Sequence, residues 1–206
     1  MVEDYPEWSL GLLDQEIKAK LNIYSTWLLQ EGIKKGLISN KTSSYIWEEF
    51  IIHSLGFSFI INSQYKSRNI CDLGSGAGIP GVPVAITTPQ RNFFLVERSK
   101  KRYFELERLK ILLEIDNIQP VLSSAESFIG QSNNEIGLYI SRCFMPKEKI
   151  ISELFIKNNK KQGVEAILVS SNKKEKIKNK DLFHVKQEKI MINKTKTRNI
   201  DVITFK

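Results

Sequence analysis

Along the first third of the chain, apolar residues recur at intervals of three and four, which is the spacing of one helix face. They include Trp8, Leu12, Leu13, Ile17, Leu21, Tyr24, Leu28 and Leu29. This pattern predicts an N-terminal helical extension over residues 1–66.

From residue 67 onward, short apolar runs alternate with amphipathic stretches, a pattern typical of strands connected by helices. The runs that predict strands are residues 70–73, 93–97, 118–122, 138–141, 166–170, 182–192 and 200–205. The clearest helix follows the second run, and Ser99 is its expected cap. The apolar stripe of this helix consists of Tyr103, Phe104, Leu106, Leu109, Leu112 and Leu113.

The last two apolar runs are joined by polar, lysine-rich residues 193–199, without a helical pattern between them. We therefore expect an antiparallel hairpin at one edge of the sheet. Residues 172–180 are a low-complexity charged segment, which indicates a solvated loop. The predicted fold is α/β and Rossmann-like, with a mostly parallel seven-stranded sheet and an antiparallel C-terminal hairpin in a domain of residues 67–206.

The composition fits one domain plus the extension, because 206 residues can bury a sizeable core without disulfides. No apolar stretch reaches the ~18 to 20 residues of a membrane span, and Glu3 and Asp4 differ from the basic start of a signal peptide. Cys71 and Cys143 are the two cysteines, which suits a reducing compartment. We therefore expect a monomeric, cytoplasmic protein without a membrane segment.

The formal charge of +8 is concentrated near the C-terminus, where residues 157–206 hold 14 Lys or Arg and 5 Asp or Glu. Such a basic segment suits a polyanion such as RNA. A nucleotide bias of the genome also produces lysine-rich chains, so the charge alone leaves the partner open.

Three glycines, Gly74, Gly76 and Gly78, follow directly on the first predicted strand. A tight turn at this place needs positive φ angles, and the missing Cβ atoms let a ligand lie against the backbone. Pro80 fits the first turn of the next helix, and Gly81 lets that helix approach the sheet closely. The turn therefore predicts a cofactor site.

The same residues also satisfy the dinucleotide pattern G-x-G-x-x-G, so the flanking residues must distinguish the cofactors. Asp72 would oppose the pyrophosphate of NAD, whereas it suits the ammonium and sulfonium groups of S-adenosyl-L-methionine. Glu97 ends the second strand and is expected to accept the ribose hydroxyls of either cofactor. The terminal hairpin, which is characteristic of methyltransferases, favours S-adenosylmethionine.

In detail, the chain resembles one family, the bacterial small-subunit ribosomal RNA guanine-N7 methyltransferases, also called glucose-inhibited division protein B. Residues 72–86, with Pro-Gly-Val-Pro at 80–83, are similar to the family signature, and the resemblance covers roughly residues 14–206. Two segments depart from the family pattern. Residues 50–54 replace its His-Ile-Leu-Asp-Ser, and residues 170–171 replace its Lys-Gly.

The resemblance implies methyl transfer from S-adenosylmethionine to N7 of a guanine in 16S ribosomal RNA, as free RNA or within the small ribosomal subunit. It also implies that the cofactor or the site is contacted by Gly74, Ile79, Ala125, Glu126 and Arg142. Guanine N7 carries an available lone pair, so this transfer needs no general base. We expect the protein to act chiefly by holding its reactants in line.

For the substrate, Arg142 is expected to orient guanine through O6 or to bind a phosphate, the alternative being a surface ion pair. Phe144 is equally compatible with stacking on the target base and with core packing. Further RNA contacts are expected from four basic residues, the alternative being an ordinary solvated surface: Lys100, Lys101, Arg102 and Arg198.

Cys143 stands near the point where cytosine-C5 methyltransferases carry a nucleophilic cysteine. Neither a preceding proline nor a second cysteine accompanies it, so we expect Cys143 to have a packing role. His53 and His184 lack ligand spacing, and no metal site is expected.

Three other functions stay open from the sequence. The first is an NAD-dependent oxidoreductase that uses the same glycine turn. The second is an S-adenosylmethionine-binding module that contacts RNA or the ribosome without this activity. The third is a methyltransferase with another RNA or a protein as its target.

Overall fold

The computed structural model describes residues 5–131, 135–157, 162–170 and 182–206. The predicted loop at residues 172–180 lies outside the described residues. No helix among the described residues is long and apolar enough to cross a membrane.

The N-terminal extension is helical but consists of short pieces. They are η1 (Glu7–Leu12), α1 (Gln15–Trp27), η2 (Leu28–Gly32), η3 (Asn40–Tyr45), η4 (Ile46–Ile52) and α2 (His53–Gln64). Asp14 begins α1, because its carboxylate accepts a hydrogen bond from the Ile17 N–H at 2.8 Å. Gly36, with a φ of +67°, lies in the turn that separates η2 from η3.

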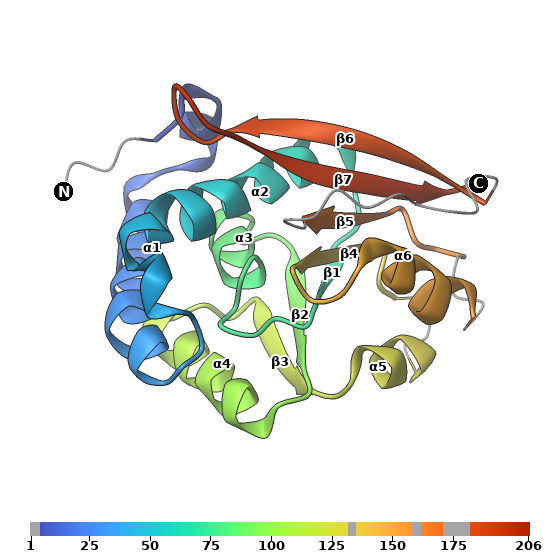
Figure 1. Cartoon of the computed structure of the whole chain (residues 1–206), viewed down its shortest axis with the longest axis horizontal. Coiled ribbons are helices and arrows are strands. Elements are labelled where there is room, and N and C mark those ends of the chain that lie inside the picture. The colour runs from blue at the N-terminus through green and yellow to red at the C-terminus, as the bar shows by residue number, and fades with distance from the viewer. Residues whose placement is uncertain (1–4, 132–134, 158–161, 171–181) are drawn as a thin grey trace.

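Seven strands form one sheet in the order β3-β2-β1-β4-β5-β7-β6. They are β1 (Asn69–Leu73), β2 (Asn92–Glu97), β3 (Ile118–Leu122), β4 (Leu138–Arg142), β5 (Ala166–Ser170), β6 (Phe183–Met191) and β7 (Thr197–Phe205). Strands β1 to β5 pair in parallel, while β7 is antiparallel to both β5 and β6. The predicted mostly parallel sheet with a C-terminal antiparallel hairpin is therefore confirmed (Figure 1).

Helices cover both faces of this sheet, and alternate residues of each strand point to opposite faces. The extension packs on one face together with α3 (Gly81–Thr87) and α4 (Lys100–Leu113). The other face carries α5 (Ala125–Gln131), α6 (Lys147–Lys149) and η5 (Ile150–Ile156). In β1, Ile70 therefore joins the first hydrophobic cluster and Cys71 the second.

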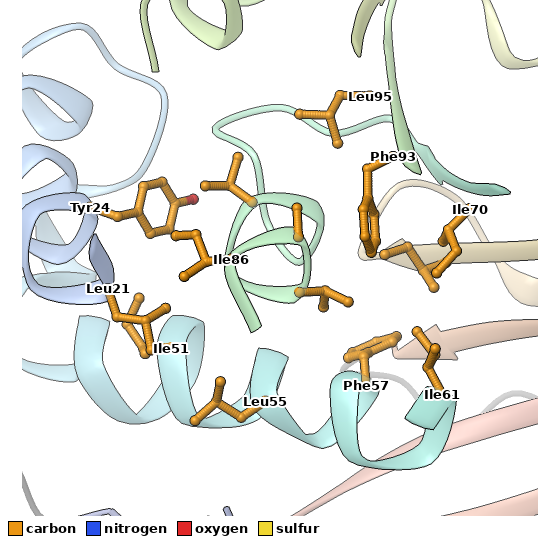
Figure 2. Packing of buried hydrophobic residues seen from close by; sticks show 14 of the residues in the cluster. Leu21, Tyr24, Ile51, Leu55, Phe57, Ile61, Ile70, Ile86, Phe93 and Leu95 are labelled. Carbon is orange, nitrogen blue, oxygen red and sulfur yellow. The ribbon is translucent and has the colours of Figure 1, made fainter. Parts of the chain in front are cut away.

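Figure 2 shows how the extension enters the core of the sheet. Leu21 and Tyr24 of α1 and Phe57 of α2 lie in one cluster with Ile70 of β1 and Phe93 of β2. All five side chains are at most 1% exposed. The extension and the sheet thus share one core, and the division at residue 66 stays a prediction.

Three details of the predicted elements differ from the structure. Ser99 is the N-cap residue of α4, as expected, but its side chain makes no capping hydrogen bond; its N–H donates to Glu97. On α4, Phe104 and Leu112 are about half exposed, because six apolar positions are more than one helix face can bury. The hairpin connection is shorter than predicted, because hydrogen bonds between Asn193 and Lys196 close the turn and β7 begins at Thr197.

Candidate functional site

The glycine turn lies at the carboxyl end of β1, where the strand order reverses between β1 and β4. Gly74, Gly76 and Gly78 have φ angles of +72°, +59° and +90°, as predicted for a tight turn. Hydrogen bonds from the Gly74 and Ser75 N–H groups to the Val96 carbonyl hold the turn against β2. Pro80 directly precedes α3 rather than standing within its first turn.

Gly81 is required for the close approach of α3 to the sheet. A Cβ at this position would meet Asp72 Oδ2 at 2.5 Å and Leu95 Cδ2 at 2.6 Å. The Gly81 N–H donates to Asp72 Oδ2 over 3.1 Å. The predicted role of Gly81 in helix packing is therefore confirmed.

Asp72 lies beneath the turn and is fully buried, so its side chain does not face a ligand cavity. Burial raises the pKa of this carboxyl group from 3.8 to about 7. The expected direct contact between Asp72 and the cofactor is absent from this arrangement. Asp72 instead accepts the hydrogen bond of the Gly81 N–H at the start of α3, so its carboxyl group holds this helix against the sheet.

Glu97 ends β2 and is held by two backbone groups. Its carboxylate accepts hydrogen bonds from the Gly76 N–H at 3.0 Å and from the Ser99 N–H at 2.8 Å. Arg102 Nη1 lies 3.9 Å from the same carboxylate. These contacts fix the Glu97 side chain at the wall of a cavity.

This cavity, the strand-end cavity, has a volume of about 330 Å³ and lies at the carboxyl ends of β1 to β4. It brings together residues that are far apart in the sequence. The lining residues are Gly74, Val96, Glu97, Arg98, Arg102, residues 123–126 and residues 142–145. Gly74, Glu97, Ala125, Glu126 and Arg142 of the predicted cofactor site are therefore gathered around one space.

A second cavity, the extension cavity, has a volume of about 320 Å³ and adjoins the first. It lies between the glycine turn and the N-terminal extension, and its lining includes Gly76 and Ile79. The two cavities share four lining residues, which are Gly74, Arg102, Arg142 and Cys143. Gly78 lines neither cavity and packs closely against Val82.

Arg142 stands where the two cavities meet, and its side chain is only 9% exposed. Its Nη1 donates to the Glu49 carbonyl oxygen at 2.5 Å, and its Nη2 lies 3.7 Å from the Glu49 carboxylate. The guanidinium also lies 4.8 Å from the centre of the Phe50 ring. Arg142 is therefore not an exposed surface arginine, which was the alternative interpretation of the sequence. Its contacts with Glu49 and Phe50 of η4 hold the side chain where the two cavities meet.

Phe144 and Cys143 border the same junction. The Phe144 ring packs against the backbone of Gly74, where any Cβ would overlap it. Cys143 is exposed, and its φ of +52° is unusual for a residue other than glycine. The prediction that Cys143 has a packing role is wrong, because the turn after β4 directs its side chain out of the core.

The basic residues expected at RNA separate into two groups. Lys100 and Arg102 are exposed, and Arg102 lines both cavities. Lys101 donates to the Lys35 carbonyl oxygen at 2.7 Å. Arg198 binds both oxygens of the Glu49 carboxylate, so this arginine is engaged within the protein.

Glu49, Phe50 and Tyr24 of the extension are the site residues that the sequence did not reveal. Glu49 binds three basic residues, which are Arg142, Arg198 and Lys196. Burial raises the pKa of Glu49, but the hydrogen bonds and positive charges of Arg198 and Lys196 outweigh this effect and lower the pKa to about 2. The one available signal was a pair of acids, Glu48 and Glu49, within an apolar segment.

The fold is that of known methyltransferases. The N-terminal domain of human METTL16, solved in complex with SAH, gives a TM-score of 0.57 at 12% identity and covers 76% of this chain and 70% of its own. Human methyltransferase 10 domain containing protein gives 0.56 at 12% identity and covers 74% of this chain and 81% of its own. The sheet order and the glycine turn thus define the Rossmann-like fold that these methyltransferases share.

Sequence comparison narrows this class to one family. The family model described as rRNA small subunit methyltransferase G matches residues 17–202, and the chain belongs to this family. The relative of that name from Mycoplasma capricolum is 29% identical over 86% of this chain and 79% of its own length. The one from Photobacterium profundum is 31% identical over 55% of this chain, which spans about half (54%) of that relative.

Proposed function

We propose that this protein transfers a methyl group from S-adenosylmethionine to N7 of a guanine in small-subunit ribosomal RNA. The observation that carries the proposal is the convergence of Gly74, Ile79, Ala125 and Arg142 on two adjoining cavities at the reversal of strand order. Ligands of open α/β sheets bind at this place. Family membership supplies the RNA substrate.

The two adjoining cavities suit S-adenosylmethionine, because this ligand has a nucleoside end and an amino-acid end that are joined through one sulfur atom. In the strand-end cavity, Glu97 would receive the ribose hydroxyls, while Ala125 and Glu126 would border the adenine. In the extension cavity, Arg142 would bind the carboxylate of the amino-acid end. Arginine carries five N–H donors and Glu49 contacts only two of its nitrogens, so donors remain for this carboxylate.

The bound cofactor supplies a methyl group activated by a positively charged sulfur. The guanine N7 lone pair accepts this group without prior loss of a proton, so the protein has to orient the base and exclude water. Phe144 lies at the cavity wall beside Gly74, where an aromatic ring can support the flat face of a base. Exposed Arg98, Lys100 and Arg102 at the start of α4 would bind RNA phosphates.

Small ribosomal subunits that lack the modification provide the test of this activity. The purified protein is incubated with them and with methyl-labelled S-adenosylmethionine, and the RNA is digested to nucleosides. We expect the label in 7-methylguanosine. Label in a different nucleoside would assign another target, and the absence of label from subunits and from free RNA would leave only a binding module.

A further inference from the structure

Within the described residues, the extension contacts the glycine turn through one buried hydrogen bond. The Tyr24 hydroxyl of α1 donates to the Ala77 carbonyl oxygen at 2.9 Å, across 53 residues of sequence. Tyr24 is fully buried, and Ala77 is 5% exposed. Burial and the nearby Asp72 carboxyl raise the pKa of Tyr24, so this hydroxyl keeps its proton and remains a donor.

Ala77 lies in the part of the turn that makes no hydrogen bond to the sheet; the Gly78 N–H of its peptide donates to the Ser75 carbonyl oxygen within the turn at 2.7 Å. Ala77 stands between Gly76 and Gly78, whose positive φ angles reflect the wide conformational range of glycine. The remainder of the turn is tied to the sheet, because Gly74 and Ser75 bond to Val96, and the Gly76 N–H bonds to Glu97. Among the described residues, the Tyr24 hydroxyl is the group that donates a hydrogen bond to the Ala77 carbonyl oxygen.

The geometry points to Tyr24 as a positioning residue: its hydroxyl fixes the Ala77–Gly78 peptide and so holds the glycine turn ready for S-adenosylmethionine. This inference rests on the proposed function. Without the hydroxyl, a peptide beside two glycines gains freedom, and the ligand has to restrict that freedom when it binds. The extension would thus contribute to cofactor affinity as well as to the core.

Tyr24→Phe tests this inference, because it removes the hydroxyl and keeps the ring that stacks on Trp27 at 6.3 Å. The affinity of S-adenosylhomocysteine is measured by calorimetry. We expect the dissociation constant to rise by up to about fivefold, because the ligand then has to order a peptide that one buried hydrogen bond had held. Tyr139→Phe is the matched control: this ring is 2% exposed and packs on Phe155 on the opposite face of the sheet.

Hydrogen exchange gives a second readout that a purely structural role would not produce. The Gly78 and Ile79 N–H groups both donate to the Ser75 carbonyl oxygen inside the turn. In Tyr24→Phe their exchange should accelerate, while exchange in the middle of α1 should stay as in the wild type. Hydrogen exchange needs no ligand, so it tests the positioning role of Tyr24 independently of cofactor binding. Failure of the wild-type protein to bind S-adenosylhomocysteine would refute the proposed function instead.

Two results would overturn the inference. One is wild-type affinity in Tyr24→Phe together with unchanged exchange at Gly78 and Ile79. The other is an equal loss of affinity in Tyr24→Phe and Tyr139→Phe, which would assign the effect to general destabilisation. A weaker affinity in Tyr24→Phe alone, accompanied by faster exchange in the turn, supports it.

Discussion

Replacing Asp72 with Asn should change how the stability of the protein depends on pH. The carboxyl group is buried, and its Oδ1 has no hydrogen-bond partner among the described residues. Its pKa is about 7 in the folded protein, against 3.8 ordinarily. Between these two values the folded protein holds a proton that the unfolded chain releases. The contribution of Asp72 to stability is therefore fully present below pH 3.8 and is lost as pH rises toward 7.

The size of this effect follows from the two pKa values. A shift of one pKa unit corresponds to about 1.4 kcal/mol, so the full shift of Asp72 corresponds to about 4 kcal/mol. An experiment from about pH 5 to about pH 8 covers about two units of this shift. Over that range, the wild-type protein should lose about 3 kcal/mol of stability through Asp72. Asparagine stays neutral and still offers an oxygen to the Gly81 N–H, so the variant loses the pH dependence and keeps this bond.

The assay is urea unfolding of both proteins across this pH range, followed by tryptophan fluorescence. The unfolding free energy of Asp72→Asn minus that of the wild type should increase by about 3 kcal/mol from about pH 5 to about pH 8. Taking this difference cancels the other titrating groups. A difference that stays constant with pH would refute the reasoning, because it would mean that Asp72 titrates alike in the folded and unfolded states.

His53 provides a control of opposite sign. Burial, together with the charge of Arg142, lowers the pKa of His53 from 6.5 to about 3. The neutral histidine therefore adds stability above pH 6.5 that is lost as pH falls toward 3. The unfolding free energy of His53→Gln minus that of the wild type should decrease by about 2 kcal/mol from about pH 5 to about pH 6.5.

Two further predictions concern the turn and the arginine. Gly81→Ala should destabilise the protein by about 1–3 kcal/mol in urea unfolding, because the new Cβ meets Asp72 and Leu95. Gly130→Ala is the control, and it should be neutral or stabilising because the space around its Cβ is open. Equal losses of stability in the two variants would contradict the packing explanation. Arg142→Lys should weaken S-adenosylhomocysteine binding about tenfold in calorimetry. It should leave the affinity for 5′-methylthioadenosine, which lacks the amino-acid end, unchanged; equal losses for both ligands would contradict the carboxylate role.

Local patterns predicted most of the fold. The strands β1, β2, β4 and β5 are mostly apolar because most of their residues are buried, whereas β3 lies at the edge of the sheet and exposes Gln119 and Leu122. The predicted bounds of all five differ from the structure by at most one residue. The hairpin was placed less accurately. Thr197, Arg198 and Asn199 pair with β6 alone, outside the part of β7 that pairs with β5. Their polar side chains follow no hydrophobic alternation, so the sequence indicated a loop.

The site was predicted where its signal is local and missed where it depends on tertiary contacts. The glycines and Glu97 adjoin strands, and their positions follow from the order of the strands. Asp72 was misinterpreted because sequence alone does not show which way a residue at a strand end faces. Tyr24 and Glu49 contact the site across 53 and 93 residues of chain, respectively, and each resembles an ordinary residue of an amphipathic helix.

The central claim, that the two cavities beside Gly74 form one S-adenosylmethionine site, is tested most directly at Cys143. This exposed thiol lines both cavities, while Cys71 is fully buried. The measurement is the rate of Cys143 alkylation by iodoacetamide, followed by peptide mass spectrometry, with S-adenosylhomocysteine or NAD present. We predict that S-adenosylhomocysteine slows the reaction at saturation and that NAD leaves it unchanged. Protection by NAD, or an unchanged rate with S-adenosylhomocysteine, would contradict the account.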